Sequence, residues 1–297
     1  MKKVIAIVGP TAVGKTKISI ELAKAFNLEI ISGDSVAVYR GLDIGSAKPT
    51  KSEMQGVVHH LIDIMDPTEQ YDVSLFQKMA RSVIEKNGCA IICGGTGLYI
   101  KSAICDYDFS SPERDEEFLK QFESYSNEEL YKYLLKLDDT IDQDKLHMNN
   151  RKRVLRAIEV KLKTEKSIHS NNQKDKEVYN AYIAYLNMSD REKLYDRINK
   201  RVDQMIEDGL VQEVKGLYDK GIYPHAIGYK EFIPYFNNEI SLETAISDIK
   251  QNSRHLAKRQ MTWFRNQLDT HFYDVDVNNI ELTIDKLKKD IKEFLEK

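Results

Sequence analysis

The stretch Gly9-Pro-Thr-Ala-Val-Gly14-Lys15-Thr16 follows the apolar run VIAIV (residues 4–8) and leads into a segment with helical spacing. It is a complete G-x4-G-K-[ST] pattern in the strand–turn–helix context that this pattern requires. Glycines let the backbone curl so that successive N–H groups face an anion, and the start of the helix adds positive potential. The sequence therefore predicts a phosphate-binding loop formed by Gly9, Pro10, Thr11, Ala12, Val13, Gly14, Lys15 and Thr16.

Two side chains of this loop have predicted roles of their own. Lys15 can place a point charge on a terminal phosphate, and the Thr16 hydroxyl can bind Mg²⁺. The loop leaves open which phosphate ester it holds, because ATP, GTP and an isoprenyl diphosphate all present a similar group.

Further apolar runs, separated by helical stretches, follow the loop: EIIS (29–32), HHLIDI (59–64) and CAIICGG (89–95). Short apolar strands that alternate with helices are typical of a doubly wound parallel sheet, so we predict an α/β fold with a P-loop parallel-sheet core. Between about residues 112 and 190 charged stretches with helical spacing replace the strand signal. We therefore expect a core of residues 1–112 and 196–297, which includes C-terminal helices, and a mostly helical insertion at 113–195.

Composition narrows the class of protein. An apolar content of 41% and a charged content of 31% suit a globular chain, and the net charge of −3 does not by itself indicate a nucleic-acid binder. Cys89, Cys93 and Cys105 form no CxxC pair, so neither a disulfide framework nor a structural zinc site is expected. No signal peptide or membrane-length apolar run is apparent, which predicts a cytoplasmic protein without a membrane partner.

Polar residues follow two of the predicted strands. Asp34 comes after EIIS, and Thr96 comes after CAIICGG. Ligands of open α/β sheets bind at the carboxyl ends of the strands, so Asp34 can accept a proton or hold the water shell of a metal ion there. The alternative for Asp34 is a structural role in a turn or helix cap. A P-loop kinase usually has a metal-binding Asp where this chain has two glycines and Thr96, which weakens a kinase assignment.

Two helical segments carry clustered cations. In a helix over the segment 246–267, Lys250, Arg254, Lys258 and Arg265 fall within about 80° of one another, and apolar residues take a separate face. The second cluster is NRKRVLR (150–156). A solvated charged face is the alternative for either helix alone, but two such faces in a net-acidic chain favour a polyanion such as nucleic acid.

Together these motifs resemble those of one family, the tRNA dimethylallyltransferases or tRNA isopentenyltransferases. The resemblance rests on eight segments in order: GPTAVGKT, ISGDSVAVYRGLDIGSAKPT, HHLIDIMDP, GGTGLYI, NRKRVLRAIEV, DRINKRVDQM, AIGYKE and AKRQMTWFR. It implies an enzyme that transfers a dimethylallyl group from dimethylallyl diphosphate to N6 of an adenosine next to the anticodon of tRNA. It also implies that the helical insertion clamps the anticodon stem-loop, and no obligate protein partner is expected.

The resemblance assigns roles to individual residues. Asp34 corresponds to the base that accepts the N6 proton, Thr96 to a residue near the bridging oxygen, and Arg201 to the residue that holds the leaving diphosphate. The family's tRNA-contacting segments correspond to Asp34, Ser35, Val36, Ala37, Lys152, Arg153, Val154, Leu155, Arg156, Gly228, Tyr229, Lys230, Lys258, Arg259, Gln260, Trp263 and Arg265. The basic helical face adds Arg254 to the predicted tRNA contacts.

The chain departs from the family pattern at Ala37, where the family usually has a glutamine that helps to read the target base, so base-edge recognition at this position stays open. The C-terminal zinc finger of eukaryotic members has no counterpart, which fits a bacterial-type enzyme. The alternatives are a P-loop small-molecule kinase that uses ATP and a non-catalytic RNA-binding NTPase. Whether ATP also binds the loop stays open.

Overall fold

The computed structural model describes residues 1–107, 115–144, 146–168 and 176–297. It divides into two compact units, the first made of Met1–Cys105 with Glu177–Lys297 and the second of Asp106–Lys176. Each unit is described by itself.

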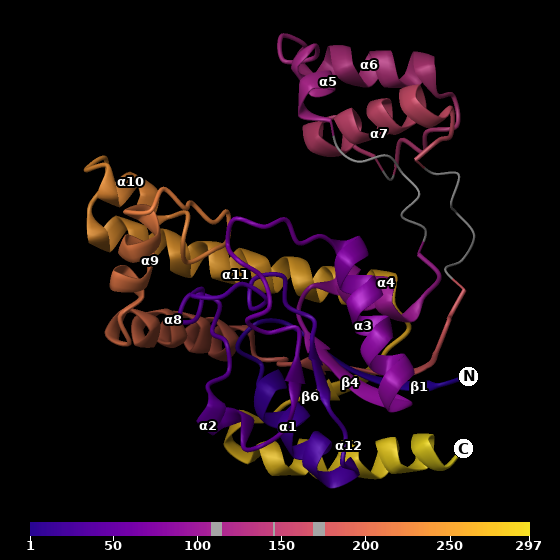
Figure 1. The fold of residues 1–297 in the computed structure, drawn as a ribbon, viewed down its shortest axis with the longest axis vertical. Coiled ribbons are helices and arrows are strands. Elements are labelled where there is room, and N and C mark those ends of the chain that lie inside the picture. Colours follow the sequence, from indigo (N-terminus) through magenta and orange to yellow (C-terminus); the bar gives the residue numbers. More distant parts are fainter. Residues whose placement is uncertain (108–114, 145, 169–175) are drawn as a thin grey trace. The chain divides into compact units, whose positions relative to one another are not determined.

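A six-stranded sheet forms the centre of the first unit, in the order β3-β2-β4-β1-β5-β6, and every strand pair in it is parallel (Figure 1). The strands are β1 (Lys3–Val8), β2 (Ile30–Ser32), β3 (His59–His60), β4 (Cys89–Gly94), β5 (Asn180–Asn187) and β6 (His271–Asp274). This confirms the predicted α/β fold with a parallel sheet. The central strand β1 lies between β4 and β5, so the loop after β1 opens at the middle of the carboxyl edge.

Strand β5 corrects the sequence prediction. Its segment NAYIAYLN falls within the predicted helical insertion, but its first six residues pair with β1 and its last six are buried. The second unit ends at Lys176, so the predicted insertion 113–195 extends too far at its carboxyl end. Aromatic residues interrupt the aliphatic pattern here, and only pairing with β1 identifies the segment as a strand.

Side chains of β1 alternate between two cores. Ile5 and Ile7 pack with helices α1 (Lys15–Phe26) and α12 (Ile280–Glu296), which follows the short 3-10 turn η1 (Val277–Asn279). The intervening residues of β1 face α3 (Val73–Asn87) and α4 (Gly97–Ile104). Figure 1 shows these two helix pairs on opposite sides of the sheet. Burial on both faces explains why the strand is a continuous apolar run.

Helices extend the first unit beyond the sheet. They are α8 (Arg191–Glu207), α9 (Leu210–Tyr218), α10 (Phe232–Phe236) and the first part of α11 (Leu242–Gln267), and they share a core with the loop that follows β2. The short helix α2 (Lys51–Met54) lies in the segment between β2 and β3. Further along α11, Ala257 and Phe264 enter the two sheet cores. The 26 residues of α11 therefore connect the helical extension to the sheet.

The second unit is helical where it is described. It contains α5 (Glu116–Lys120), α6 (Asn127–Leu137) and α7 (Arg151–Thr164), which pack around a small apolar core. A capping box at Ser126 and Glu129 begins α6, and Arg151 donates hydrogen bonds to the carbonyl oxygens of Phe122 and Tyr125. The core and these bonds hold α5, α6 and α7 together as one body.

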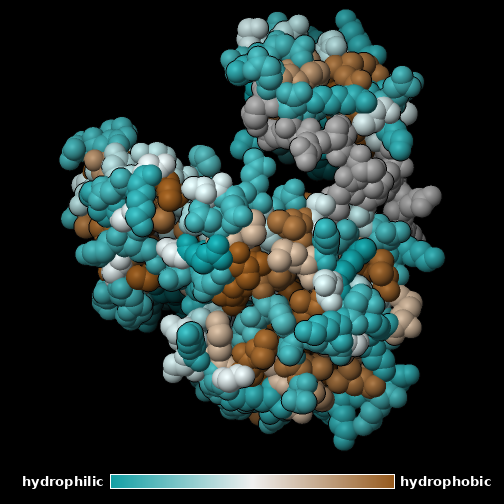
Figure 2. Space-filling view, in the orientation of Figure 1, coloured by the Kyte–Doolittle hydropathy of each residue, from teal (hydrophilic) through white to brown (hydrophobic). Residues whose placement is uncertain are grey.

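No helix in the described ranges is long and apolar enough to cross a membrane. The face drawn in Figure 2 is mostly hydrophilic, and its hydrophobic side chains gather in separate patches on both units rather than in one continuous band.

Candidate active site

The loop after β1 has the backbone that its glycines require. Gly9 has φ 149° and Gly14 has φ 106°, both in the region that favours glycine. A Cβ atom on Gly9 would lie 2.3 Å from the carbonyl oxygen of Leu186 on β5, so this glycine also allows the loop to pass close to the neighbouring strand. Gly14 caps α1, and the first N–H groups of that helix therefore open at the loop.

The side chain of Lys15 lies folded along this loop. Its ammonium donates hydrogen bonds to the carbonyl oxygens of Gly9 (3.0 Å) and Pro10 (2.7 Å). The pKa of Lys15 is lowered to about 8, mainly by burial and also by the charge of Arg201, although Cys93 and Asp34 oppose this shift. A bound diphosphate would replace these carbonyl contacts with charged ones and raise the pKa again.

Helix α8 contributes two arginines to the loop. The Arg201 guanidinium donates to the Thr11 hydroxyl (3.1 Å), and Nε of Arg197, one turn earlier, donates to the carbonyl oxygen of Ala12 (2.9 Å). Burial is the main cause that lowers the pKa of Arg201, and the Asp34 carboxylate opposes it. Sequence reasoning missed Arg197; its spacing of four residues from Arg201 on one helix face was the available signal.

The ends of β2 and β4 meet beside this loop. The Gly33 N–H donates to the Cys93 carbonyl oxygen (2.8 Å), and a Cβ atom on Gly94 would lie 2.4 Å from the Gly33 oxygen. Only glycine at position 94 permits this approach, which brings Asp34 and Thr96, the residues just beyond, to the same sheet edge.

Asp34 is partly buried and held by its own turn. Its Oδ1 accepts hydrogen bonds from the N–H groups of Val36 (2.8 Å) and Ala37 (3.2 Å), while Oδ2 has no hydrogen-bond donor within the described ranges. The turn role and the proposed base role are thus compatible, because they use different oxygens. Thr96 begins α4, and its hydroxyl makes no capping bond to that helix.

Helix α11 presents part of the predicted basic face. Lys258, Arg259 and Arg265 are exposed. Arg254 donates to Asn199 on α8 (2.7 Å), and Lys250 forms an ion pair with Asp203 (2.5 Å). The outer residues of the row are therefore available to a polyanion, whereas Lys250 and Arg254 also connect α11 to α8.

The inward side of α11 carries Gln260 and Trp263. Gln260 contacts the loop after β1 and the turn after β4. A Cβ atom on Gly97 would lie 2.0 Å from the Trp263 ring, so this ring covers the start of α4. These two predicted tRNA-contacting residues therefore lie against the site rather than on the outer face of the helix.

On α7 only part of the predicted segment is exposed. Lys152 and Arg153 are exposed, whereas Arg156 pairs with the buried Glu159 (2.7 Å). The Val154 side chain is buried in the core of the second unit, which contradicts the prediction that it contacts tRNA, whereas Leu155 is partly buried and packs against that core. Their apolar spacing on α7 is the reason for this packing.

The segment Gly228 to Lys230 differs most from its predicted role. Tyr229 is 0% exposed, and its hydroxyl donates to Glu213 (2.8 Å), so the assignment of its side chain to tRNA binding is wrong for this structure. Glu213 also accepts hydrogen bonds from backbone N–H groups of the loop at Gly45. A Cβ atom on Gly45 would lie 2.6 Å from the Tyr229 ring. This motif therefore shapes the loop between β2 and β3, while Lys230 is exposed.

The loop after Asp34 is likewise partly internal. Ala37 is buried, and Val36 packs against the core of the helical extension. The buried Ala37 side chain is therefore unavailable to a base in this structure, which contradicts the prediction that this side chain contacts tRNA, whereas the Val36 side chain is only partly buried. Asp34 and Ser35 remain partly accessible.

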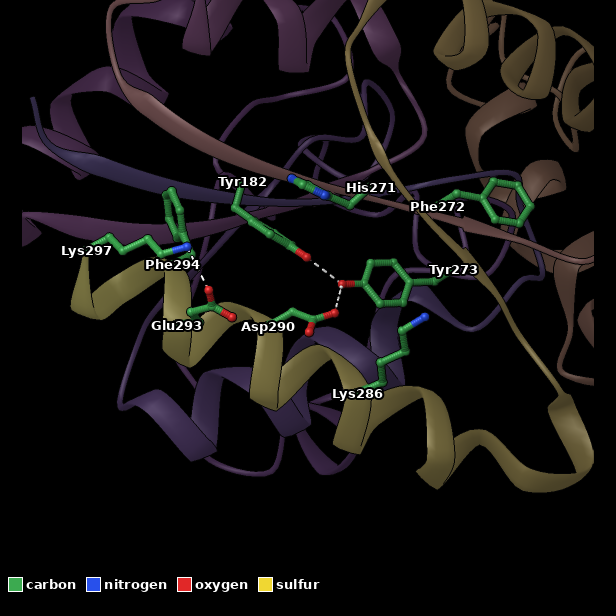
Figure 3. A pocket seen from close by; sticks show the side chains of 9 residues that line it. All are labelled: Tyr182, His271, Phe272, Tyr273, Lys286, Asp290, Glu293, Phe294 and Lys297. Atoms are coloured by element: carbon green, nitrogen blue, oxygen red, sulfur yellow. Dashed lines mark hydrogen bonds and ion pairs between the residues drawn. The ribbon is translucent and has the colours of Figure 1, made fainter.

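A separate pocket lies between β6 and α12 (Figure 3). Tyr182, which lines this pocket, pairs with Ile5 of β1 in the amino-terminal half of both strands. The polar groups of the pocket form hydrogen bonds with one another: Tyr182 contacts Tyr273, and the Tyr273 hydroxyl donates to Asp290 (2.6 Å). None of the predicted site residues lines this pocket. It is therefore distinct from the candidate active site.

The fold and the site define the class of this protein: an α/β protein with the G-x4-G-K-[ST] loop at the carboxyl edge of a parallel sheet, where arginines of α8 contact the loop and a carboxylate follows β2. A family model described as IPP transferase matches residues 37–267, and the chain belongs to this family.

Similar proteins agree with this assignment. A tRNA dimethylallyltransferase of Staphylococcus carnosus is 49% identical, with 97% of this chain and 96% of the relative covered. One of Enterococcus faecalis is 46% identical over 100% of this chain and 98% of the relative.

Solved structures are also similar. A tRNA isopentenylpyrophosphate transferase of Bacillus halodurans is 43% identical, with a TM-score of 0.74 and coverage of 100% of this chain and 97% of the other. A eukaryotic dimethylallyltransferase acting on tRNA is 30% identical, with a TM-score of 0.77 over 92% of this chain and 74% of the other.

Proposed function

We propose that this protein is an enzyme that transfers a dimethylallyl group from dimethylallyl diphosphate to the exocyclic N6 of an adenosine next to the anticodon of tRNA. Family membership supports the reaction class. The observation that carries the proposal at this site is the convergence of a phosphate-binding loop, Arg201 and Asp34 at one sheet edge.

The loop and Arg201 suit the donor. Backbone N–H groups at the start of α1, the Lys15 ammonium and the Arg201 guanidinium all favour an anion. In the transfer, the bond between the allylic carbon and the bridging oxygen breaks, and the diphosphate keeps the electron pair. Groups that already face this position stabilise the charge as it develops, without having to reorganise. We assign to Thr96 the donation of a hydrogen bond to the departing oxygen, which its hydroxyl can make because it does not cap α4.

Asp34 suits the acceptor side. As N6 forms its bond to the allylic carbon, it must lose a proton, and Oδ2 of Asp34 has no competing donor among the described residues. Oδ1 is occupied by two backbone N–H groups, which fix the orientation of the carboxylate. We therefore assign proton acceptance to Oδ2.

The donor set fits Mg²⁺ bound mainly by substrate. Thr16 is exposed on the first turn of α1 and makes no side-chain hydrogen bond within the described ranges, and no group of three His, Cys, Asp or Glu residues that could hold a metal occurs in those ranges. Mg²⁺ commonly binds to one or two protein oxygens together with phosphates and water. Thr16 would hold the ion, which neutralises charge on the diphosphate when bound.

The exposed cations of α11 and of α7 suit the tRNA backbone, with Lys258, Arg259 and Arg265 on one helix and Lys152 and Arg153 on the other. An unpaired base in a loop is extruded at a cost of only a few kcal/mol, which suits an acceptor in the anticodon loop. The site itself provides no base-specific contact at Ala37, so adenosine selection must come from other contacts.

The test is direct. Wild-type protein is incubated with labelled dimethylallyl diphosphate and undermodified tRNA, and separately with labelled ATP and the same tRNA. We expect the label of the first donor in tRNA and no phosphoryl transfer from the second. Transfer from ATP alone would identify a kinase, and binding of tRNA with no transfer from either donor would identify a non-catalytic RNA-binding protein.

A further inference from the structure

Gln260, on the inward side of α11, joins the two backbone segments that meet at the donor site. Its Oε1 accepts a hydrogen bond from the Thr11 N–H (2.9 Å), and its Nε2 donates to the Gly95 carbonyl oxygen (3.1 Å). Thr11 belongs to the loop after β1, and Gly95 belongs to the turn after β4. One side-chain amide therefore connects the phosphate-binding loop to the turn that carries Thr96.

Both the oxygen and the nitrogen of the Gln260 amide thus form hydrogen bonds to backbone segments of the site. It is partly buried, whereas its neighbours Lys258 and Arg259 are exposed. The Gln260 amide also packs directly against the backbone of Gly95, because a Cβ atom on Gly95 would lie 2.3 Å from Nε2 of Gln260. A side chain held in this way is not free to contact a tRNA bound on the outer face of α11.

Thr11 is also hydrogen-bonded to a second helix, because its hydroxyl accepts a hydrogen bond from Arg201 on α8. Its backbone and its side chain are thus held by different helices. A loop that binds an anion through backbone N–H groups depends on a fixed backbone path, because a displaced loop must be reordered when the ligand binds.

We propose that Gln260 is a positioning residue for the diphosphate donor, which holds the phosphate-binding loop and the Thr96 turn in register, and that it is not a tRNA contact. This inference rests on the proposed function for the identity of the donor. The link from Gln260 to the loop can be measured with inorganic diphosphate, which does not depend on that identity.

The experiment compares Gln260→Met, which keeps the length of the side chain and removes both bonds, with wild type. Calorimetry measures the affinity for inorganic diphosphate with Mg²⁺ and for dimethylallyl diphosphate, and filter binding measures the affinity for undermodified tRNA. We expect diphosphate affinity to fall about tenfold, the effect of losing roughly one to two net hydrogen bonds. Affinity for tRNA should stay within about twofold, and the KM for the donor should rise more than kcat falls.

A matched control is Gln251→Met on the same helix, where the glutamine is exposed and makes no side-chain hydrogen bond within the described ranges. It should leave both affinities unchanged. Circular dichroism and thermal melting show whether each variant folds.

A second route keeps the test decisive if Gln260→Met does not fold. Gly95→Ala drives a methyl group into Nε2 of Gln260 and should weaken diphosphate binding by itself. Combining it with Gln260→Ala removes the clash, so the double variant should bind diphosphate no more weakly than Gln260→Ala alone, a clear departure from additivity. Strict additivity, unchanged diphosphate affinity in Gln260→Met, or a loss confined to tRNA affinity would each overturn the proposal. A wild type that binds inorganic diphosphate but does not use dimethylallyl diphosphate would overturn the proposed function alone.

Discussion

The Arg201 guanidinium and the Thr11 hydroxyl are joined by a hydrogen bond of 3.1 Å, although the residues lie 190 positions apart in the chain. The bond ties α8 to the phosphate-binding loop, and the neighbouring Asp34 carboxylate favours the charged form of Arg201. Because this bond already fixes the arginine on the loop before the substrate binds, its positive charge does not have to move during the reaction. The proposed donor site is therefore organised by residues from several elements of the first unit.

Replacing Lys15 with alanine should abolish use of the donor and leave tRNA affinity within a few-fold. The Lys15 ammonium lies in the loop after β1, where we propose that the diphosphate binds, and the exposed cations of α7 and α11 are on other elements. Transfer of labelled dimethylallyl groups and filter binding of tRNA measure the two effects on the same preparation. An equal loss of tRNA binding would show that Lys15 does not act on the donor alone.

Donor affinity should fall as the pH rises through about 8. Burial lowers the pKa of Lys15 to about 8 in the free protein, and only the charged ammonium attracts the diphosphate, so binding above this pH requires uptake of a proton. The loss approaches tenfold per pH unit, and it is absent well below pH 8, where Lys15 is already charged. Calorimetry with inorganic diphosphate in two buffers of different ionisation enthalpy measures both affinity and proton uptake.

Lys15→Arg is the matched control for this pH dependence, because the guanidinium remains charged throughout the range. Whatever diphosphate affinity this variant retains should vary less with pH than that of wild type. If both proteins show the same slope above pH 8, the titrating group belongs to the ligand or to another residue.

Replacing Asp34 with asparagine should lower the single-turnover rate by roughly 10²–10⁴, the usual range for losing a general base. Affinity for both substrates and the fold should change little, because the amide oxygen of asparagine can still accept the N–H groups of Val36 and Ala37. Rapid-quench transfer under single-turnover conditions gives the rate. Near-normal turnover would show that Asp34 has only the structural role in its turn that the hydrogen bonds to Oδ1 indicate.

Removing charge from the outer face of α11 should weaken tRNA binding and reduce its salt dependence. Lys258→Ala and Arg265→Ala each remove an exposed cation, and the slope of log affinity against log salt should change by somewhat less than one unit for each phosphate that the variant no longer neutralises. Diphosphate affinity should hardly change. Binding isotherms at several salt concentrations, with circular dichroism of each variant, provide the measurement.

Lys250→Ala serves as the comparison on the same helix. Lys250 is paired with Asp203, so its removal should have the smallest effect on tRNA affinity of the predicted row. Unchanged affinity and slope in Lys258→Ala and Arg265→Ala would identify this face as an ordinary solvated one.

Replacing Tyr229 with phenylalanine should destabilise the first unit by about 1 kcal/mol, the net value of one hydrogen bond, without a specific effect on tRNA. The bond that this change removes is the one to Glu213, which keeps its backbone partners in the loop at Gly45. Urea unfolding and tRNA binding distinguish the two roles. A loss of tRNA affinity with unchanged stability would restore the contact role that the sequence resemblance implies.

Local chemistry in the sequence was sufficient for much of this protein. The pattern from Gly9 to Thr16 specifies its loop because few other residues accept the backbone angles found at Gly9 and Gly14. The apolar runs of β1 and β4 indicated a buried parallel sheet, because both of their faces are covered. The outward cations of α11 followed from helical periodicity alone.

Only the tertiary structure decided which of the remaining motif residues are buried in a core and which are exposed. Strand β5 became recognisable through its pairing with β1, and Tyr229 proved to be a core residue because the space it fills lies against Gly45, far away in the sequence. Gln260 and Lys258 are two residues apart on one helix, yet one is directed toward the loop and the other toward solvent. A sequence motif records which residues occur together, but packing between distant segments determines the direction in which each side chain points.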